Sequence, residues 1–345
     1  DWHTGLIPIW LRKADWSGAI LFTIHNLAYQ GFFDNHFMTT YRLGQDWPNR
    51  QDSVPELPLN FMSQGIIWAD MVTTVSQHYA REILTSEYGA GLEHLLYARR
   101  DKLVGIVNGI DYEEYNPSTD RFLAATYNPV KIDARLINKL ALQRKMGLPE
   151  DINAPVIGMV SRLDDQKGLD IVINSLSCLF ERTNAQMVIL GRGREHYHQL
   201  LRKSAEKHPC RLAVSHEFND ALAHLIYAGC DMFLMPSRFE PCGLGQLIAM
   251  RYGAVPVVRY TGGLADTVEN LSADLTEGSG FVFREYDVNV MLQAIQRAIN
   301  AYQDKLAWQK IMQRIMSLDF SWQSSALKYE SVYQKVLELK GCVNG

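Results

Sequence analysis

Cysteine is scarce in this sequence, and its spacing excludes two kinds of site. The 345 residues include five cysteines, an odd number, and no Cys-x-x-Cys pair: Cys178, Cys210, Cys230, Cys242 and Cys342. An irregular set of this kind favours reduced thiols in a reducing compartment over a disulfide framework or a zinc site. We therefore expect a protein that is not secreted.

Long apolar runs and a strong charge bias are also missing. No run approaches the ~20 residues of a membrane span. Lys and Arg number 34 against 38 Asp and Glu, for a net charge of −4. The composition therefore indicates neither a membrane nor a nucleic acid as partner, and the positive charge for a phosphate ligand must be local. The histidines lack metal-ligand spacing such as His-Glu-x-x-His, so no metal is expected.

The remaining composition is that of an ordinary globular enzyme. Hydrophobic residues make up 47% and charged residues 21%. A chain of this length is expected to form two domains. It buries roughly three quarters of its unfolded surface, so it needs no disulfide or metal to hold it together.

Short apolar runs alternate with longer amphipathic stretches along the chain, which predicts an α/β fold with parallel sheets covered by helices on both faces. The predicted strands are Ala19–Ile24, Met71–Val75, Leu103–Val107, Val156–Val160, Met187–Leu190, Leu212–Val214, Asp231–Met235 and Val255–Val258. Helices are predicted at Ala134–Met146, Leu169–Phe180, Glu195–Lys207, Ala221–Tyr227 and Leu244–Tyr252.

Turn-forming residues between Asn108 and Pro129 interrupt this alternation. We therefore predict a first domain over residues 1–111 and a second over 112–323. The tail, residues 324–345, is predicted to form an amphipathic helix that returns to the first domain. Three prolines and several polar residues at Trp47–Pro58 predict a long loop.

Two basic residues follow the predicted strand Val156–Val160. Arg162 and Lys167 lie five positions apart on a loop that Gly168 closes. Ligands of open α/β sheets bind at the carboxyl ends of the strands. Arg and Lys there would stabilise a diphosphate leaving group. The alternative is a pair of exposed basic side chains beside Asp164 and Asp165; spacing alone gives the two interpretations equal weight.

The turn Pro236–Gln246 joins a buried strand to an apolar helix and carries Glu240, Cys242 and Gly243. A carboxylate there is suited to binding sugar hydroxyls, and the amides that open the helix at about Leu244 are suited to facing an anion. The alternative is a glutamate that caps the helix. A lone cysteine is more often a small buried residue than a nucleophile, and we adopt that interpretation for Cys242.

Two further glycine-containing turns follow predicted strands. Thr261, Gly262 and Gly263 allow close backbone approach to a ligand, or form a tight turn. Gly191 and Gly193 are followed by His196 where a dinucleotide fingerprint has its third glycine, so no NAD site is predicted.

In the first domain, Asp1, Trp2 and His25 lie beside a strand end. A Trp ring stacks well on the apolar face of a sugar. His25 would reach a sugar hydroxyl; taken alone, it is better interpreted as a strand-end histidine with a local partner.

Together these motifs resemble the bacterial glycogen synthase and plant starch synthase family of retaining GT-B glycosyltransferases. The matching segments occur in the family's order and span nearly the whole chain: 1–5, 25–31, 108–111, 161–169 without Asp164 and Asp165, 236–244, and Arg259 with 261–264. The resemblance implies two Rossmann-like domains facing a cleft. It also implies transfer of glucose from ADP-glucose to the non-reducing end of an α-1,4-glucan such as glycogen, starch or a maltooligosaccharide, with retention and no cofactor.

The resemblance also assigns roles to residues of this chain. Arg162 and Lys167 would hold the diphosphate, Glu240 the donor glucose, and His25 the transferring glucose. Asp1 and Trp2 would line the acceptor side. The remaining residues assigned to donor binding are Asn108, Cys242, Gly243, Leu244, Thr261, Gly262, Gly263 and, through a loose match to an aromatic beside adenine, Phe218.

Two departures from the family pattern are visible. Ile248 stands where related transferases often carry a second glutamate, which favours the starch and glycogen synthase branch. The family's early Lys-x-Gly-Gly-Leu loop is absent. We therefore expect an N-terminally truncated chain with an incomplete first sheet, inactive by itself.

Other functions stay open at this point. One is a UDP-sugar-dependent GT-B transferase, and another is a non-catalytic glucan-binding homologue; a two-domain binding protein fits the architecture but not the phosphate loops. The expected location is the cytoplasm of a bacterium or the plastid stroma of a plant or alga.

Overall fold

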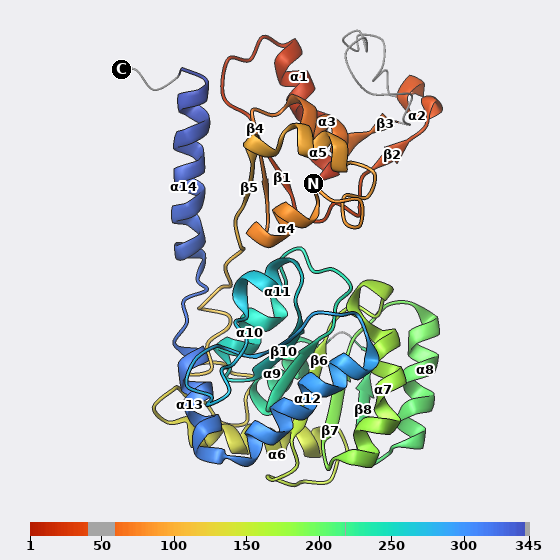
Figure 1. Ribbon diagram of the computed structural model, residues 1–345, viewed down its shortest axis with the longest axis vertical. Helices are drawn as coiled ribbons and strands as arrows, with labels where there is room; N and C mark the ends of the chain where they lie inside the picture. The colour runs from red at the N-terminus through yellow and green to blue at the C-terminus, as the bar shows by residue number, and fades with distance from the viewer. Residues whose placement is uncertain (41–58, 218, 342–345) are drawn as a thin grey trace. The chain divides into compact units, whose positions relative to one another are not determined.

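The computed structural model of the chain describes residues 1–40, 59–217 and 219–341 and is drawn in Figure 1. The chain divides into two compact units. The first consists of Asp1–Val107 with Ala326–Gly345, and the second of Asn108–Ser325. Each unit is built on its own parallel sheet, which confirms the predicted α/β class. The predicted loop at Trp47–Pro58 lies outside the described residues.

The second unit contains a six-stranded parallel sheet with the order β11-β10-β9-β6-β7-β8. Nearly every residue of the four central strands is buried, because both faces of the sheet are covered. The strands are β6 (Val156–Val160), β7 (Gln186–Leu190), β8 (Leu212–Ser215), β9 (Met232–Met235), β10 (Val255–Arg259) and β11 (Phe281–Phe283).

Helices lie on both sides of this sheet (Figure 1). They are α6 (Arg135–Lys145), α7 (Leu169–Arg182), α8 (Glu195–Lys207), α9 (Asp220–Gly229), α10 (Gly245–Arg251), α11 (Gly262–Thr267), α12 (Val288–Gln303) and α13 (Lys305–Met316). Side-chain caps define several starts. The Asn219 carboxamide accepts from the Leu222 N–H, and Asp304 accepts from the Ala307 N–H.

The order of the strands creates one special position in this sheet. From β6 the chain moves outward to β7 and β8; it then returns to β9 on the other side of β6 and moves outward to β10 and β11. The connections after β6 and β9 therefore lead in opposite directions. Such a switch point leaves a crevice at the carboxyl ends of the two strands, where ligands of open α/β sheets bind.

The first unit has a three-stranded parallel sheet with the order β1-β4-β5. Its strands are β1 (Leu21–Ile24), β4 (Met71–Thr74) and β5 (Leu103–Gly105), and a short antiparallel pair joins β2 (Phe32–Phe33) to β3 (Leu59–Asn60). Its helices before residue 108 are α1 (Ile7–Lys13), α2 (Asn35–Thr40), α3 (Phe61–Trp68), α4 (Gln77–Glu82) and α5 (Glu93–Ala98), with 3-10 turns η1 (Trp2–Thr4) and η2 (Arg100–Lys102).

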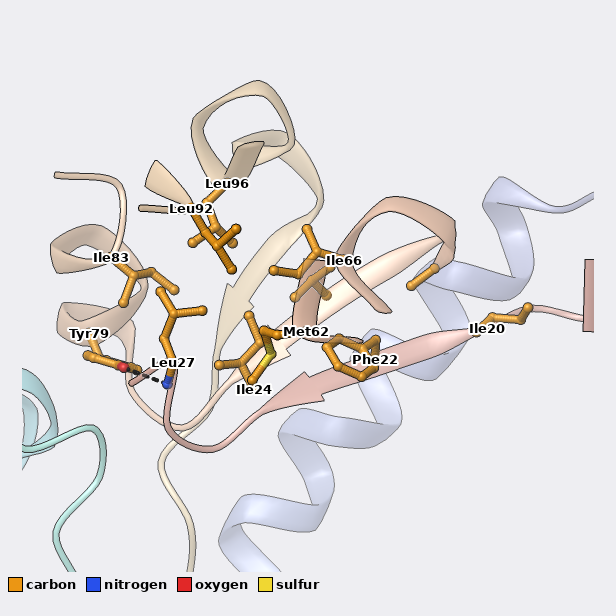
Figure 2. Packing of buried hydrophobic residues seen from close by; sticks show 12 residues of the cluster. Ile20, Phe22, Ile24, Leu27, Met62, Ile66, Tyr79, Ile83, Leu92 and Leu96 are labelled. Atoms are coloured by element: carbon orange, nitrogen blue, oxygen red, sulfur yellow. Dashed lines mark hydrogen bonds between the residues drawn. The ribbon is translucent and has the colours of Figure 1, made fainter. Parts of the chain in front are cut away.

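The core of the first unit lies between β1 and the helices that follow it. This core is a cluster of buried apolar side chains, and Figure 2 shows Ile24, Leu27 and Met62 packed together within it. Tyr79 is buried beside them, and its hydroxyl accepts a hydrogen bond from the Leu27 N–H at 3.1 Å. This bond satisfies a backbone donor just after β1 and holds the chain where it leaves the strand.

Helix α14 (Trp322–Leu339) runs from the second unit into the first. Its residues Val332 and Val336 pack with Met71 and Ile106 in a separate apolar cluster. No helix in the described ranges has both the length and the apolar character needed to cross a membrane.

The eight predicted strands are all present, with ends shifted by a residue or two. β11 was not predicted, because three residues are too few to show a period. Its place at the edge of the sheet comes from pairing with β10. The predicted domain boundary falls between residues 111 and 112, whereas the structure divides the chain between residues 107 and 108.

Candidate functional site

A cavity of about 220 Å³ opens at the switch point of the second unit. The ends of β6 and β9 form its floor, and the loops that follow them form its walls. Charged and polar wall residues include Ser161, Arg162, Lys167, Ser237 and Glu240. Gly243 and Leu244 also line it, so the structure brings five of the predicted site residues together at this cavity: Arg162, Lys167, Glu240, Gly243 and Leu244.

The two loops are held against each other by close backbone contact. Gly168 has φ +73°, and a Cβ at this position would lie 2.2 Å from the carbonyl oxygen of Pro236. A side chain is therefore excluded both by conformation and by space. The contact also carries a hydrogen bond from the Arg238 N–H to the Gln166 carbonyl at 2.8 Å. As a result, Lys167 is delivered to the turn that carries Glu240.

Lys167 and Glu240 form an ion pair, with Nζ 2.6 Å from Oε2. The same carboxylate oxygen accepts a hydrogen bond from the Ser237 hydroxyl at 2.9 Å. Only 15% of the Lys167 side chain and 7% of the Glu240 side chain are exposed. Removal of one partner would leave a buried unpaired charge, so this pair fixes both side chains firmly.

Arg162 lies at the more open side of the cavity. Its side chain is 55% exposed, and its guanidinium approaches Asp164 at 3.3 Å and the Gln166 side-chain oxygen at 3.2 Å. Because more than half of the Arg162 side chain is exposed, water screens its ion pair with Asp164 and the attraction is weak. Arg162 and Lys167 therefore present positive charge at two depths of the same cavity.

Cys242 belongs to the turn that carries Glu240, but it is buried and does not line the cavity. It is therefore not placed to act as a nucleophile. Burial raises the pKa of its thiol to about 12, although a hydrogen bond from the Asn108 backbone opposes the rise. The thiol is therefore protonated at neutral pH and weakly nucleophilic. The same contact brings Asn108, another predicted site residue, to the back of the turn.

Thr261, Gly262 and Gly263 are buried and are not among the residues that line the cavity. A Cβ on Gly262 would lie 1.9 Å from the Glu240 carbonyl oxygen, and one on Gly263 would lie 1.8 Å from that of Cys242. The paired glycines thus allow close approach to the turn that carries Glu240. Direct contact of these residues with a donor stays a prediction.

In the first unit, Asp1 binds the chain at the end of β1. Its Oδ1 accepts the N–H groups of His25 at 2.7 Å and Asn26 at 3.2 Å. Partial burial lowers the pKa of His25, so its ring is neutral at neutral pH. Trp2 stacks on His3, with ring centroids 3.9 Å apart, and lies against Gly31.

Several functional candidates were missed at the level of sequence. Ser237 donates a hydrogen bond to Glu240, and Gln166 accepts one from Arg162. The side chain of Gln246 is buried beneath the turn that carries Glu240. Ser237 and Gln246 lie inside motifs already singled out, but nothing in their spacing indicated their partners. Phe218, predicted beside adenine, lies outside the described residues.

Two other kinds of site fit the described residues less well. Nowhere in residues 1–40, 59–217 and 219–341 do three or more His, Cys, Asp or Glu side chains cluster to hold a metal ion. A larger cavity of about 1060 Å³ lies beside β11 and α12. Its walls include none of the predicted site residues, so we regard the smaller cavity as the better candidate.

Comparison with known proteins relates the chain to one group of enzymes. Residues 1–98 match the family described as "Starch synthase catalytic domain", and residues 143–313 match "Glycosyl transferases group 1". The chain is 46% identical over 344 residues to a glycogen synthase of Anaeromyxobacter sp., covering 97% of this chain and 72% of that protein. It is also 46% identical over 347 residues to that of Moorella thermoacetica, covering 98% and 70%.

A solved structure with a related sequence shows the same architecture. The catalytic domain of starch synthase IV from Arabidopsis thaliana, determined with ADP and acarbose bound, superposes with a TM-score of 0.88 at 34% identity. The match covers 98% of this chain and 72% of that one.

Proposed function

This chain belongs to the glycogen synthase family of glycosyltransferases, which have the GT-B fold, and from that premise we propose the reaction. It transfers glucose from ADP-glucose to the non-reducing 4-hydroxyl of an α-1,4-glucan, with retention at the anomeric carbon. The observation that carries this proposal is the Lys167–Glu240 pair at the switch point of the second unit, beside Arg162.

The arrangement of charge at the cavity fits this reaction. When the bond between the anomeric carbon and the phosphate oxygen breaks, the bonding electrons go to the diphosphate and the sugar becomes oxocarbenium-like. Fixed cations stabilise the charge that grows on the leaving group. Lys167 supplies one at depth and Arg162 a second near the opening. The acceptor oxygen then bonds to the anomeric carbon on the face that the diphosphate leaves, and its proton passes to the departing phosphate oxygen.

Glu240 is assigned to sugar binding and not to nucleophilic attack. Lys167 and Ser237 both donate hydrogen bonds to its carboxylate. These bonds make the carboxylate less nucleophilic and fix its orientation. An acceptor in this position is suited to the hydroxyls of the donor glucose. Cys242 is its buried neighbour, and Gly243 and Leu244 continue the same wall.

For the first unit, the proposed roles follow from local contacts. Asp1 holds the backbone at His25, so it positions the strand end where His25 would stabilise the transferring glucose. The neutral ring of His25 retains a nitrogen acceptor for a sugar hydroxyl. Trp2 is proposed for the acceptor side. For Asn108, Thr261, Gly262 and Gly263, donor binding is proposed through the turn they support.

The bacterial sources of the similar glycogen synthases favour the cytoplasm as location. The plastid stroma is the corresponding proposal for a plant or algal source. Fractionation of the source cells distinguishes the two.

The test is glucose transfer to glycogen by the full-length protein, with ADP-glucose and UDP-glucose in competition. Arg162→Ala and Lys167→Ala are each expected to lose about 2–4 kcal/mol of transition-state stabilisation, or roughly 30- to 900-fold in kcat/KM. Lys203→Ala, on the exposed surface of α8, is the control and should match the wild type.

Folding must be checked because Lys167→Ala leaves the Glu240 carboxylate buried without its partner. Assays are therefore run below the thermal transition of each variant, with the double variant Lys167→Met, Glu240→Gln as a neutral replacement of the pair. No transfer by the wild type, or wild-type kcat/KM in both Arg162→Ala and Lys167→Ala, would contradict the proposal. Preference for UDP-glucose would correct the donor.

A further inference from the structure

Gln246 is a buried amide directly behind the turn that carries Glu240. It is the second residue of α10 and has no exposed surface. Its Nε2 lies 3.2 Å from the Cys242 carbonyl oxygen, 2.8 Å from that of Gly243, and 3.1 Å from the Thr267 hydroxyl. One side chain thus holds two successive peptide groups of the turn.

The orientation of this amide is fixed by its partners. Backbone carbonyls only accept hydrogen bonds, so the nitrogen of the amide and not its oxygen must face them. Oε1 is then left buried without a partner among the described residues. A buried acceptor without a donor destabilises a fold, so each such atom needs an explanation. Stability alone does not explain a glutamine at this position.

The contact decides which way the turn presents its backbone. A trans peptide points its N–H opposite to its C=O, and no cis peptide occurs in the described residues. Because Gln246 draws the carbonyls of Cys242 and Gly243 inward, the N–H groups of Gly243 and Leu244 point away from it. Gly243 and Leu244 line the cavity, whereas Cys242 and Gln246 do not.

Gln246 also connects this turn to the glycine-containing turn before α11. The Thr267 hydroxyl that it contacts donates to the Gly263 carbonyl at 2.6 Å. The Gly263 N–H in turn donates to the Glu240 carbonyl at 2.9 Å. Glu240 and Gly243 are therefore fixed through one network that closes on a single amide.

We propose that Gln246 is a positioning residue for glucose transfer: it holds the peptide groups of residues 242–244 so that the wall of the donor cavity keeps its shape. This inference rests on the proposed function. Gln246 touches no substrate itself. It acts through Gly243, Leu244 and Glu240, and so it affects the donor and not the acceptor.

The test compares Gln246→Met with Gln143→Met in the full-length protein. Gln143 is an equally buried glutamine of the second unit, with bonds to Asp151 and Gln186 and none to the cavity. Both variants lose hydrogen bonds, so both are expected to lower the Tm. Assayed where each is folded, only Gln246→Met should lose kcat/KM for ADP-glucose, by about 10- to 100-fold, while the KM for glycogen changes less than twofold.

Thr267 provides an independent check of the network. Thr267→Ser keeps the hydroxyl and should retain wild-type kcat/KM, whereas Thr267→Val removes it and should lose several-fold. If Gln246→Met retains the wild-type kcat/KM for ADP-glucose, or if Gln143→Met loses as much, Gln246 has only a structural role. A wild-type protein that transfers no glucose contradicts the proposed function instead, so the two failures are distinguishable.

Discussion

The side chain of Lys167 can pair with Glu240 and still bind a phosphate group. The Lys167 ammonium has three N–H donors, of which the Glu240 carboxylate takes one. The ion pair therefore does not prevent Lys167 from contacting a phosphate oxygen as well. A lysine suits this double role, because its donors rotate around one point charge.

His216 and His198 form a second polar contact at the carboxyl ends of β7 and β8. The Nε2 atom of His198 accepts the Gly193 N–H at 3.2 Å, so its proton is on Nδ1. That Nδ1–H is directed at Nδ1 of His216, 2.6 Å away. Both rings must be neutral for this chain of bonds to exist, because a proton on Nδ1 of His216 removes the acceptor.

The pH dependence of folding follows from this contact. Burial is the largest cause that lowers the pKa of His216; the neighbouring His198 and Arg202 lower it further, and Glu195 opposes them. The unfolded chain titrates at about 6.5 and so binds more protons just below that pH. The contribution of the neutral His216 ring to the free energy of unfolding is therefore complete above about pH 6.5. It is lost as the pH decreases through the folded-state pKa of His216.

We expect His216→Gln to reduce the loss of stability between pH 7 and pH 5, measured by urea unfolding. His196→Gln, an exposed histidine of the same helix as His198, should leave the wild-type slope unchanged. A ring titration of His216 by NMR at or above pH 6.5 would contradict the assignment.

Among the elements, the short α11 supports the site through close packing at its start. Gly263 lies in this first turn, and its Cα faces backbone atoms of Cys242. An added methyl group has no flexible neighbour to displace. The turn that carries Glu240 must move instead, and with it the wall of the cavity.

Gly263→Ala is therefore expected to cost about 1–3 kcal/mol of stability and to lower kcat/KM at least tenfold. The control is Gly147→Ala after α6. Gly147 has φ +69° but open space around it, so this variant should lose only about 1–2 kcal/mol through backbone strain and keep its kcat/KM. Thermal unfolding and glucose transfer are measured on both; wild-type kcat/KM in Gly263→Ala would contradict the role given to this turn.

The whole chain is organised so that its first unit is discontinuous in sequence. Residues from Ala326 onward belong with residues 1–107, and Val332 and Val336 cover Met71 and Ile106. β4 and β5 thus depend on a segment more than two hundred residues away, whereas the second unit is one continuous stretch.

We expect truncation after Ser325 to uncover Met71 and to raise hydrogen exchange in β4 and β5. Exchange in β6 and β9 should stay as in the intact protein, because no residue of the second unit is removed. Hydrogen exchange with mass spectrometry measures both in one sample. Leu339→Ala, an exposed position on the same helix, is the control and should leave exchange in β4 and β5 unchanged. Unchanged exchange in β4 and β5 after truncation would show that α14 is not needed to protect them.

The sequence by itself determined the alternation of strands and helices and the loops that carry the ligands. Buried parallel strands need continuous apolar runs, and helices need a period of 3.6, so both are legible locally. It also placed Arg162, Lys167 and Glu240 after strands. The family resemblance came from the order of these same motifs.

Only the tertiary structure decided what these residues touch. Lys167 meets Glu240 across 73 positions of sequence, and this depends on β6 lying beside β9. Strand order is set by the packing of the entire sheet, which no local period records. The same limit explains why neither the contacts of Gln246 nor the packing of Gly262 and Gly263 against the turn of Glu240 is legible in the sequence.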